Sequence, residues 1–297
     1  MGMMLEQRSP QLLGLAYRML GSMADAEDVV QDAWIRLHQT QPKPASEQAF
    51  LYRIVSNLCI DRLRRLKVER RHYFGPWLPE PVADASLDLE DAAIAAQDLS
   101  TGFLLLIEKL SPAERIVYVL RQAFDFSYQE ISQILAITPA CARQRAHRAQ
   151  QRLREAALDA PPEVVQKASQ KSMLTELATR VAAADIDGVI KLLSDDVVAL
   201  TDGGGVVSAA IIPVTGRQRI AQMAVFLHRK HAAAERSSLF SRVNGGWSMV
   251  DVEQGALQAC LQIETDGALI RRIYVVRNPA KLKNLSVSLG LRLPEQL

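Results

Sequence analysis

An acidic amphipathic segment followed at once by a basic one, within residues 25–71, is the feature that most limits what this chain can fold into. The first segment reads DAEDVVQDAWIRL, in which apolar side chains recur at helical spacing and the acidic ones take the other faces. The second, FLYRIVSNLCIDRLRRLKVERR, sets a polar stripe opposite an apolar face on a further helix. Such a pair suits a protein that offers one surface to a protein partner and a neighbouring surface to nucleic acid. Taken alone, the segment also fits two ordinary surface helices of mixed charge. The polar stripe consists of Arg53, Asn57, Asp61 and Arg64.

Length and composition indicate a globular protein of several domains. The chain of 297 residues is long enough for two or three domains, each with a core of its own. No apolar run approaches the roughly 20 residues that span a bilayer, and the amino terminus has no basic region followed by an apolar core. The three cysteines are scattered without metal-binding spacing, which fits a reducing compartment. We therefore expect a cytoplasmic protein with no membrane attachment, no metal and no cofactor.

Proline and glycine clusters divide the chain into four segments. Residues 1–72 and 101–160 read as all-helical modules, and residues 161–297 have a different texture. The linker between the helical modules, residues 73–100, carries six acidic residues and no basic one from Glu80 onward. An acidic tether that contains prolines is a solvated linker by default, although it could also occupy a positively lined channel in a partner.

The last segment starts with helices and continues with short β-branched runs. Asp202-Gly203, Asn244-Gly245 and Asp266-Gly267 mark hairpins between these runs, and GRQRIAQMAVFLHRK reads as one more helix. Helices followed by a meander of antiparallel strands indicate an α+β domain, with helices packed on one face of a curved sheet. Strands are expected at 197–201, 206–214, 237–243, 247–253, 256–264 and 268–277.

The second helical module contains two helix starts separated by a tight turn. Ser127 is the expected N-cap of the first helix, and the Glu130 side chain can accept a hydrogen bond from the Ser127 backbone N–H. Thr138 is the expected N-cap of the second helix, and Pro139 is its first residue. Residues 139–154 carry five arginines and no acidic residue, with small apolar residues on the opposite face. A recognition helix in the major groove of DNA requires this pattern, although an ordinary helical hairpin with a basic face is the alternative. The exposed face is expected to hold Arg143, Gln144, His147, Arg148 and Gln151.

In this order and spacing, the two helical modules resemble regions 2 and 4 of bacterial sigma factors of the sigma-70 family, and more narrowly the extracytoplasmic-function (ECF) type. DAEDVVQDAW is similar to the helix that binds core polymerase, and AFLYRIVSNLCIDRLRR to the helix that reads and melts the −10 element. LSPAERIVYVLRQAFDFSYQEISQILAITPACARQRAHRAQQRLRE is similar to the helix-turn-helix that reads the −35 element. The resemblance implies a promoter-specificity subunit with core RNA polymerase and promoter DNA as partners. It assigns polymerase binding to Asp28, Gln31 and Asp32, −10 binding to Arg53, Asn57, Asp61, Arg64 and Arg65, and −35 binding to Arg143, Gln144, His147 and Arg148.

The last segment resembles the SnoaL-like domain that is fused to one group of ECF factors. The motifs that carry this resemblance are WLPEP in the linker and DGGG in the third domain. It implies a contact between the fused domain and region 2 that tunes polymerase binding in cis, without a separate anti-sigma protein. Val206, where the group often has lysine, and the turn after Asn244, which lacks an expected proline, depart from the pattern. The implied regulatory interface comprises Trp77, Pro79, Asp202, Gly203, Gly204 and Gly205.

The expected fold is thus two all-α modules, a region 2 bundle and a region 4 helix-turn-helix, followed by an α+β SnoaL-like cone domain. Two other classes of function stay open. A ligand-responsive helix-turn-helix regulator would explain residues 101–297 but leaves the oppositely charged helices without a purpose. An enzyme would need acid–base groups, and we predict no catalysis because the candidate histidines lie at a charged helix end. A pocket for a small-molecule effector remains an expectation. The candidate acid–base groups are His228, His231, Asp251 and Glu253.

Overall fold

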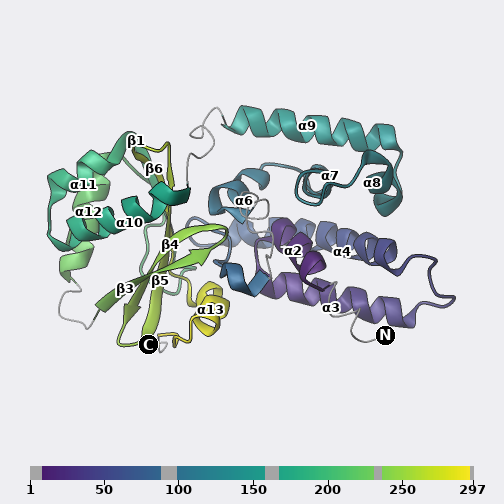
Figure 1. Cartoon of the computed structure of the whole chain (residues 1–297), viewed down its shortest axis with the longest axis horizontal. Coiled ribbons are helices and arrows are strands. Elements are labelled where there is room, and N and C mark those ends of the chain that lie inside the picture. Colours follow the sequence, from purple (N-terminus) through teal and green to yellow (C-terminus); the bar gives the residue numbers. More distant parts are fainter. Residues whose placement is uncertain (1–8, 88–98, 158–166, 231–235, 295–297) are drawn as a thin grey trace. The chain divides into compact units, whose positions relative to one another are not determined.

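The computed structural model describes residues 9–87, 99–157, 167–230 and 236–294. The chain divides into two compact units, each considered by itself (Figure 1). The helical unit comprises Met1–His72, Leu87–Leu99 and Phe103–Asp159, and the sheet unit comprises Tyr73–Ser86, Ser100–Gly102 and Ala160–Leu297. Four acidic residues of the expected linker and one candidate histidine lie outside the described residues: Asp88, Glu90, Asp91, Asp98 and His231.

The first helices of the helical unit form a bundle around an apolar centre. They are α2 (Ser9–Leu20), α3 (Met23–Gln39) and α4 (Glu47–Glu69), followed by a 3₁₀ turn at Arg70–His72. A serine hydroxyl accepts a backbone N–H at the start of both α3 and α4, which fixes where each helix begins. The apolar faces expected from the sequence are buried in this bundle, among them Val29, Val30, Ala33, Leu37, Leu51, Val55 and Leu66.

The remaining helices of this unit are α6 (Thr101–Ile107), α7 (Pro112–Gln122), α8 (Tyr128–Leu135) and α9 (Pro139–Ala157). Both α7 and α8 start with a complete capping box, in which a serine and a glutamate exchange hydrogen bonds with each other's backbone. The predicted cap of α8 by Ser127 and Glu130 is confirmed. The predicted start of α9 is confirmed as well, since Thr138 Oγ1 accepts from the Cys141 amide at 3.1 Å.

The two helical modules expected from the sequence share one core. The ring of Tyr52 on α4 meets Phe126 edge-on, with centroids 5.0 Å apart. Arg115 on α7 is 4% exposed and donates to the carbonyl of Met19 at the end of α2, at 2.6 Å. Burial lowers the pKa of Arg115, and the nearby Glu108 carboxylate compensates this charge. The modules are therefore packed into a single unit in this structure.

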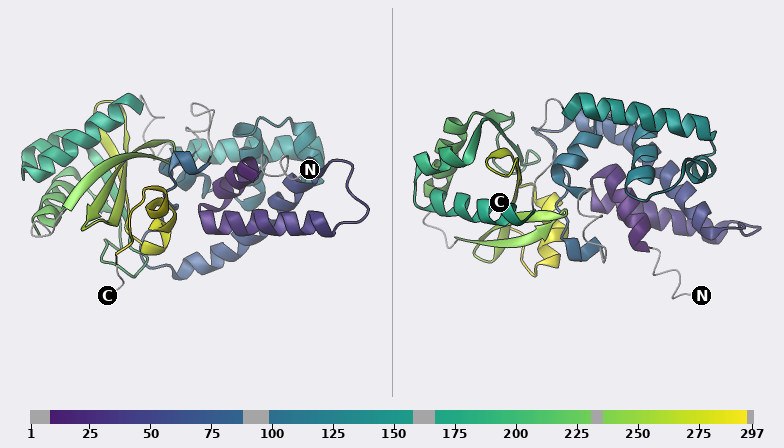
Figure 2. Two further views of the ribbon diagram at one scale, coloured as in Figure 1. Left: turned by 60° about the horizontal axis from the view of Figure 1, so that its bottom comes forward. Right: turned by 45° about the horizontal axis from the view of Figure 1, so that its top comes forward.

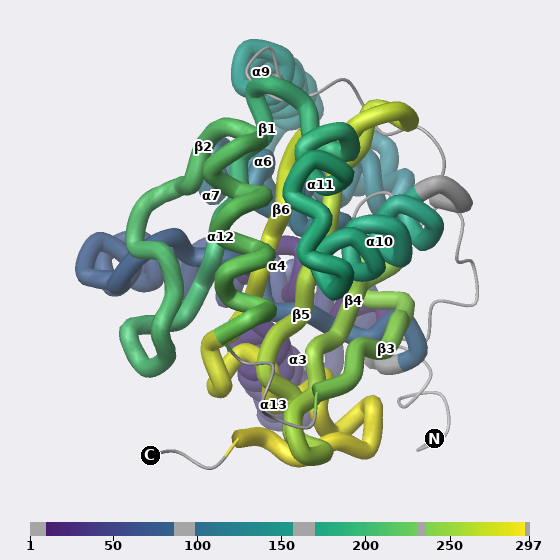
Figure 3. The backbone as a smooth tube through the Cα atoms, turned by 90° about the vertical axis from the view of Figure 1, so that its left-hand side faces the viewer, coloured from purple at the N-terminus to yellow at the C-terminus, as the bar shows by residue number. Residues whose placement is uncertain are grey.

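The sheet unit has a mixed six-stranded sheet with helices on one face (Figures 1–3). The strand order is β2-β1-β6-β5-β4-β3, and β1 pairs with β6 in parallel while all the other pairs are antiparallel. Helices α10 (Lys167–Ala182), α11 (Ile186–Leu192) and α12 (Arg217–Lys230) cover one face and enclose an apolar core. The strands are β1 (Leu193–Asp202), β2 (Val214–Thr215), β3 (Arg236–Val243), β4 (Gly246–Glu253), β5 (Ala256–Thr265) and β6 (Ile270–Val276), and α13 (Pro279–Ser288) follows.

The expected fold class, two all-α modules followed by an α+β domain, is confirmed, with three local differences. The strand expected at residues 206–214 is a loop apart from Val214, because the chain after β1 is irregular from Gly203. The sheet is not a pure antiparallel meander, since β1 lies parallel to β6. Helix α13 was not expected, although Asn278 and Pro279 form a good helix start.

The first part of the linker is not a solvated tether. Residues 73–86 belong to the sheet unit, and Leu78, Val82 and Ala83 are at most 6% exposed. Ala83 forms an antiparallel bridge with Val243 at the end of β3. We call residues 73–86 the arm. Among the described residues, no helix is long and apolar enough to cross a membrane.

Candidate nucleic-acid interface

The turn between α8 and α9 has the sharp geometry expected of a helix-turn-helix. Ala136 lies in the left-handed region, with φ 51° and ψ 47°, and its N–H donates to the Ser132 carbonyl. The next residue, Ile137, donates to the same carbonyl at 3.0 Å. The chain therefore leaves α8 and enters α9 within a few residues, with the unpaired groups of the first helix end satisfied.

One face of α9 packs against α7 and α8, and the other is open to solvent. The inward stripe of Ala142, Ala146, Ala149 and Leu153 is at most 6% exposed, as the sequence predicted. Small inward residues let the helix lie close to its partners and leave the opposite side free for a ligand. The candidate base- and phosphate-binding residues Arg143, Gln144, His147 and Arg148 are all exposed on that side. Their DNA contacts remain a prediction.

A buried glutamate fixes α9 on α7. Glu114 accepts from the Ser111 hydroxyl at 2.6 Å and from Arg152 at 2.5 Å. Burial alone would raise the pKa of Glu114, but the bonds from Ser111 and the charges of Arg152 and Arg148 hold it below the usual value. Arg152 is thus engaged in holding the helix-turn-helix together, while Arg143 and Arg148 extend the positive face.

The candidate polymerase-binding residues lie together on the exposed side of α3. Asp28, Gln31 and Asp32 stand at i, i+3 and i+4 and are exposed. Asp25 has a structural role instead. Its carboxylate accepts a hydrogen bond from Arg62 of α4 at 2.8 Å, which links α3 to α4. The candidate polymerase-binding surface therefore consists of the exposed Asp28, Gln31 and Asp32, of which the two aspartates are acidic.

The candidate −10 residues are all exposed along α4. Asp61 and Arg64 form an ion pair of 2.9 Å, with side chains 59% and 69% exposed. An exposed pair of this kind contributes little to stability, so both groups can exchange partners when a ligand arrives. The stripe consists of Arg53, Asn57, Asp61, Arg64 and Arg65.

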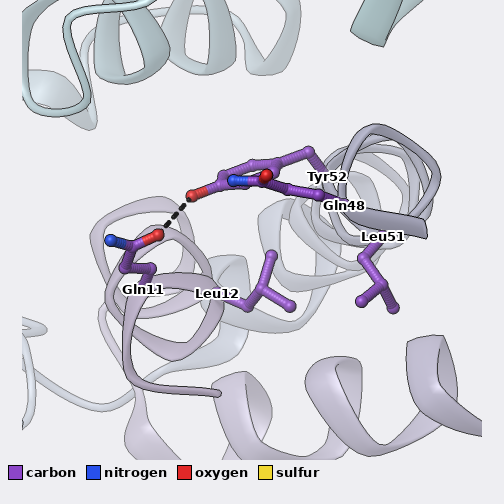
Figure 4. Close-up of a pocket in the computed structure, with 5 residues that line it drawn as sticks. All are labelled: Gln11, Leu12, Gln48, Leu51 and Tyr52. Atoms are coloured by element: carbon purple, nitrogen blue, oxygen red, sulfur yellow. Dashed lines mark hydrogen bonds between the residues drawn. The ribbon is translucent and has the colours of Figure 1, made fainter. Parts of the chain in front are cut away.

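A small hollow lies between α2 and α4 (Figure 4). Tyr52 Oη donates to Gln11 Oε1 across it at 3.2 Å, and burial raises the pKa of Tyr52 to about 12. The accessible volume of about 10 Å³ is room for one water molecule and not for a metabolite. Tyr52 is 3% exposed and belongs to the core of the helical unit. The hollow is lined by Gln11, Leu12, Gln48, Leu51 and Tyr52.

In the sheet unit, the DGGG motif binds the arm through a buried carboxylate. Asp202 is 0% exposed and accepts from Tyr73 Oη at 2.5 Å, from the Leu78 amide at 2.8 Å and from Lys281 Nζ at 2.6 Å. Lys281 also donates to the Leu78 carbonyl and lies 4.3 Å from the centroid of the Trp77 ring. The Asp202 carboxylate thus pairs with a lysine of its own domain.

The glycines of the motif allow close approach at this point. Gly204 has φ 62°, and a Cβ there would overlap the side chain of Asn278. A Cβ on Gly203 would overlap the backbone of Val207 in the same way. The Gly204 amide donates to Asp202 Oδ1 at 3.1 Å, so the loop itself helps to hold the carboxylate.

The second half of the arm is held by the turn between β3 and β4. Asn244 accepts from the Val82 amide at 2.8 Å, and its own N–H donates back to the Val82 carbonyl at 2.9 Å. Asp84 accepts from the Gly245 amide at 2.7 Å and from Arg242 at 3.1 Å. The turn does not need the expected proline, because Asn244 holds φ 51° with its side chain turned to the arm.

Sequence reasoning identified Trp77, Pro79 and the DGGG motif but missed the partners that complete their contacts. Lys281 and Asn278 lie on or beside α13, and the helix-start signal of Asn278-Pro279 was available in the sequence. Tyr73 and Asn244 had no local signal for their contacts, because their partners are 129 and 162 residues away.

Two of the candidate acid–base groups, Asp251 and Glu253, are engaged in pairs with other side chains. Asp251 accepts from Ser238 at 3.0 Å, and burial raises its pKa. Glu253 accepts from Arg236 at 2.8 Å, and His228 is exposed at the end of α12. Within residues 9–87, 99–157, 167–230 and 236–294, no group of three or more His, Cys, Asp or Glu side chains has a metal-binding arrangement.

Comparison with known proteins agrees with this geometry. The chain matches the family described as Sigma-70 region 2 over residues 4–68 and the family described as Sigma-70, region 4 over residues 102–153. It is 33% identical over 226 residues to the ECF RNA polymerase sigma factor SigJ of Mycobacterium tuberculosis, covering 74% of this chain and 70% of the relative. It is 27% identical over 283 residues to the probable ECF RNA polymerase sigma factor SigI of the same species, covering 94% of this chain and 93% of the relative.

A solved structure agrees over nearly the whole chain. The crystal structure of Mycobacterium tuberculosis extracytoplasmic function sigma factor SigJ superposes with a TM-score of 0.73 and 26% identity, covering 96% of this chain and 99% of that one. The match therefore extends beyond the two sigma regions into the arm and the sheet unit. Together with the exposed basic face of α9 and the acidic face of α3, these likenesses show that the chain belongs to the ECF family of RNA polymerase sigma factors.

Proposed function

We propose that this protein directs core RNA polymerase to specific promoters and assists opening of the −10 element. The observation that carries the proposal is the exposed basic face of α9, presented on a capped helix-turn-helix. Arginine and glutamine on such a face can read guanine and adenine edges, and the remaining arginines neutralise phosphate. The protein would act in the cytoplasm, where polymerase and promoter DNA are found.

The acidic side of α3 is the proposed docking surface for polymerase. Asp28 and Asp32 lie one helical turn apart and are exposed, so together they present a compact negative patch. The polar stripe of α4 would then receive the unstacked bases of the −10 element, since melting needs positive charge beside the single strand. A ligand-responsive regulator would have no use for the α3 surface.

Transcription from defined promoters in vitro tests the proposal. With core polymerase and the full chain, Arg143→Ala or Arg148→Ala should weaken promoter-dependent initiation by about 1–3 kcal/mol, roughly 5- to 150-fold. Arg219→Ala on α12, an exposed helical arginine of the sheet unit, is the matched control and should leave initiation unchanged. Initiation that is equally efficient without the protein would refute the proposal.

Polymerase binding is tested separately by charge reversal. Asp28→Lys with Asp32→Lys should reduce co-purification with core polymerase at least tenfold, because two attractive charges become repulsive. Asp195→Lys, at a side chain that is 84% exposed in the sheet unit, provides the control. A protein that still binds polymerase after reversal on α3 would show that this surface is not the interface.

We further propose that the sheet unit tunes initiation in cis, through the arm and through contact with region 2. Supporting this, the arm leads directly out of the −10 helix module, and it is fixed by Asp202, Asn244 and Lys281 of the sheet unit. A small-molecule effector would act by changing the same contacts. Initiation rates that are identical with the arm bound and with the arm released would count against regulation in cis.

A further inference from the structure

The downstream end of the linker is also held by the sheet unit. Residues 100–102 include the first two residues of α6, and they cluster with the sheet and not with the helices that follow. Thr101 is 4% exposed, and its hydroxyl donates to Gln262 Oε1 on β5. Gln262 donates in turn to the Val243 carbonyl at 2.8 Å and to Ser248 Oγ at 2.9 Å. Because both amide hydrogens are used, the carbonyl oxygen of Gln262 can only face Thr101.

The next residue, Gly102, lies against two polar side chains of the sheet. A Cβ on Gly102 would overlap the Glu264 carboxylate and lie 3.1 Å from Tyr274 Oη. Glu264 lies on β5 and Tyr274 on the adjacent strand β6, and their side chains share a hydrogen bond. The backbone at Gly102 therefore lies directly on this face of the sheet. We call Thr101 and Gly102 with their partners the downstream anchor.

The two ends of the linker are held at the same place. Ala83 pairs with Val243, and the carbonyl of that same Val243 accepts from Gln262, which holds Thr101. Adding the lengths of these contacts and side chains puts the chain at Ala83 and at Thr101 within about 20 Å of each other. The linker therefore has Ala83 near its start and Thr101 just after its end fixed close together on the sheet.

A segment whose two ends are held close together adds little to the distance that the whole linker can bridge. If it were free, the linker of residues 73–100 could extend to about 95 Å, at about 3.4 Å per residue. When the arm and the downstream anchor are both bound to the sheet unit, His72 and Phe103 each adjoin a residue whose position is fixed in that unit. The separation available between the two sigma regions is then set by that unit, and no longer by the linker length.

Promoter DNA makes this separation measurable, because each base pair of spacer moves the −35 element by about 3.4 Å along the duplex. We propose that the downstream anchor is a specificity determinant, which limits the promoter spacer lengths that this sigma factor can use. The inference rests on the proposed function, since it requires regions 2 and 4 to bind the −10 and −35 elements. Releasing the anchor should make longer spacers usable.

The test is a selection with holoenzyme assembled from the full chain and core polymerase. The probe is a DNA library with randomised −10 and −35 elements, separated by spacers that cover two helical turns in single-base-pair steps. Thr101→Val removes the hydroxyl and keeps the shape, and Gly102→Leu forces the backbone off the sheet. Thr179→Val on α10 is the matched control, because that exposed hydroxyl bonds only to the Thr175 carbonyl one turn earlier.

We expect a narrow spacer distribution for the wild type and for Thr179→Val, and one extended to longer spacers for both anchor variants. Hydrogen exchange should show amides 99–102 opening about tenfold more often in the variants, which verifies release. Should Gly102→Leu not fold, the Thr101→Val variant carries the test. Wild-type and variant distributions that coincide after verified release would overturn the inference. A wild-type holoenzyme that enriches no promoter would instead overturn the proposed function.

Discussion

Replacing the buried carboxylate of Asp202 by an amide should release the arm and destabilise the sheet unit. In Asp202→Asn one of the two carboxylate oxygens becomes an NH₂ group, which is a donor. If it replaces Oδ1 it faces Tyr73 Oη, and if it replaces Oδ2 it faces the Leu78 amide and Lys281. All of these groups donate to Asp202 in the wild type. The variant takes the Asp202 carboxylate away from the Lys281 ammonium, whose side chain is 13% exposed.

The expected cost is about 3 kcal/mol. Removing one partner of a buried pair costs about 3–5 kcal/mol. The lower end applies because Lys281 keeps its bond to the Leu78 carbonyl and its contact with the Trp77 ring, worth about 0.5–1 kcal/mol. For a unit of this size, about 2–4 °C per kcal/mol gives a fall in melting temperature of about 6–12 °C.

Calorimetry of the full chain measures this shift, and fluorescence of Trp77 reports whether the arm has left the Lys281 ammonium. Asp195→Asn is the control, since it makes the same chemical change at an exposed ion pair of the same unit and should cost less than about 0.5 kcal/mol. The double variant with Lys281→Met should recover part of the loss, because it also removes the buried ammonium that Asp202 balances in the wild type. A melting temperature for Asp202→Asn equal to that of Asp195→Asn would refute the reasoning.

Three further outcomes follow from single contacts. Ala136→Gly should stabilise the helical unit by about 1 kcal/mol in thermal unfolding, because it relieves a left-handed alanine; no gain would mean that the turn is unstrained. Ser127→Ala should cost about 1 kcal/mol through loss of the α8 cap, and an unchanged urea midpoint would contradict this. Burial raises the pKa of Glu264, so its ionised form is penalised in the fold at neutral pH, and the penalty disappears below the unfolded value of 4.5. Glu264→Gln should therefore raise the melting temperature at pH 8 and lose this advantage toward pH 4.5; a gain that is independent of pH would exclude the carboxylate as its source.

Local signals made the helix-turn-helix predictable. The caps at Ser127 and Thr138 and the small stripe of α9 are written within about 30 neighbouring residues, and hydrogen bonds of this kind depend only on nearby sequence. The outward charges of α3 and α4 followed from the same helical spacing. In these elements the residues named from the sequence lie where they were expected.

Contacts between distant residues were not predictable in the same way. The parallel pairing of β1 with β6 joins strands separated by most of the sheet unit, and hairpin signals favour sequential neighbours. The arm was read as a solvated tether because its prolines and acidic residues are typical of linkers. Its fixed position depends on Asp202 and Asn244, whose relevance appears only once the sheet is formed.

The arm has a consequence for building chimaeras. Since residues 73–86 complete the sheet unit, a chain cut near residue 160 loses the partners that cover Leu78 and Val82 and exposes them to water. A simple truncation therefore has two effects that cannot be separated: it removes regulation, and it exposes the apolar side chains of the arm. Exchanging this unit between two homologues requires transplanting three separated pieces of sequence together, residues 73–86, 100–102 and 160–297. Gene shuffling that moves only the carboxy-terminal piece would deliver an incomplete module.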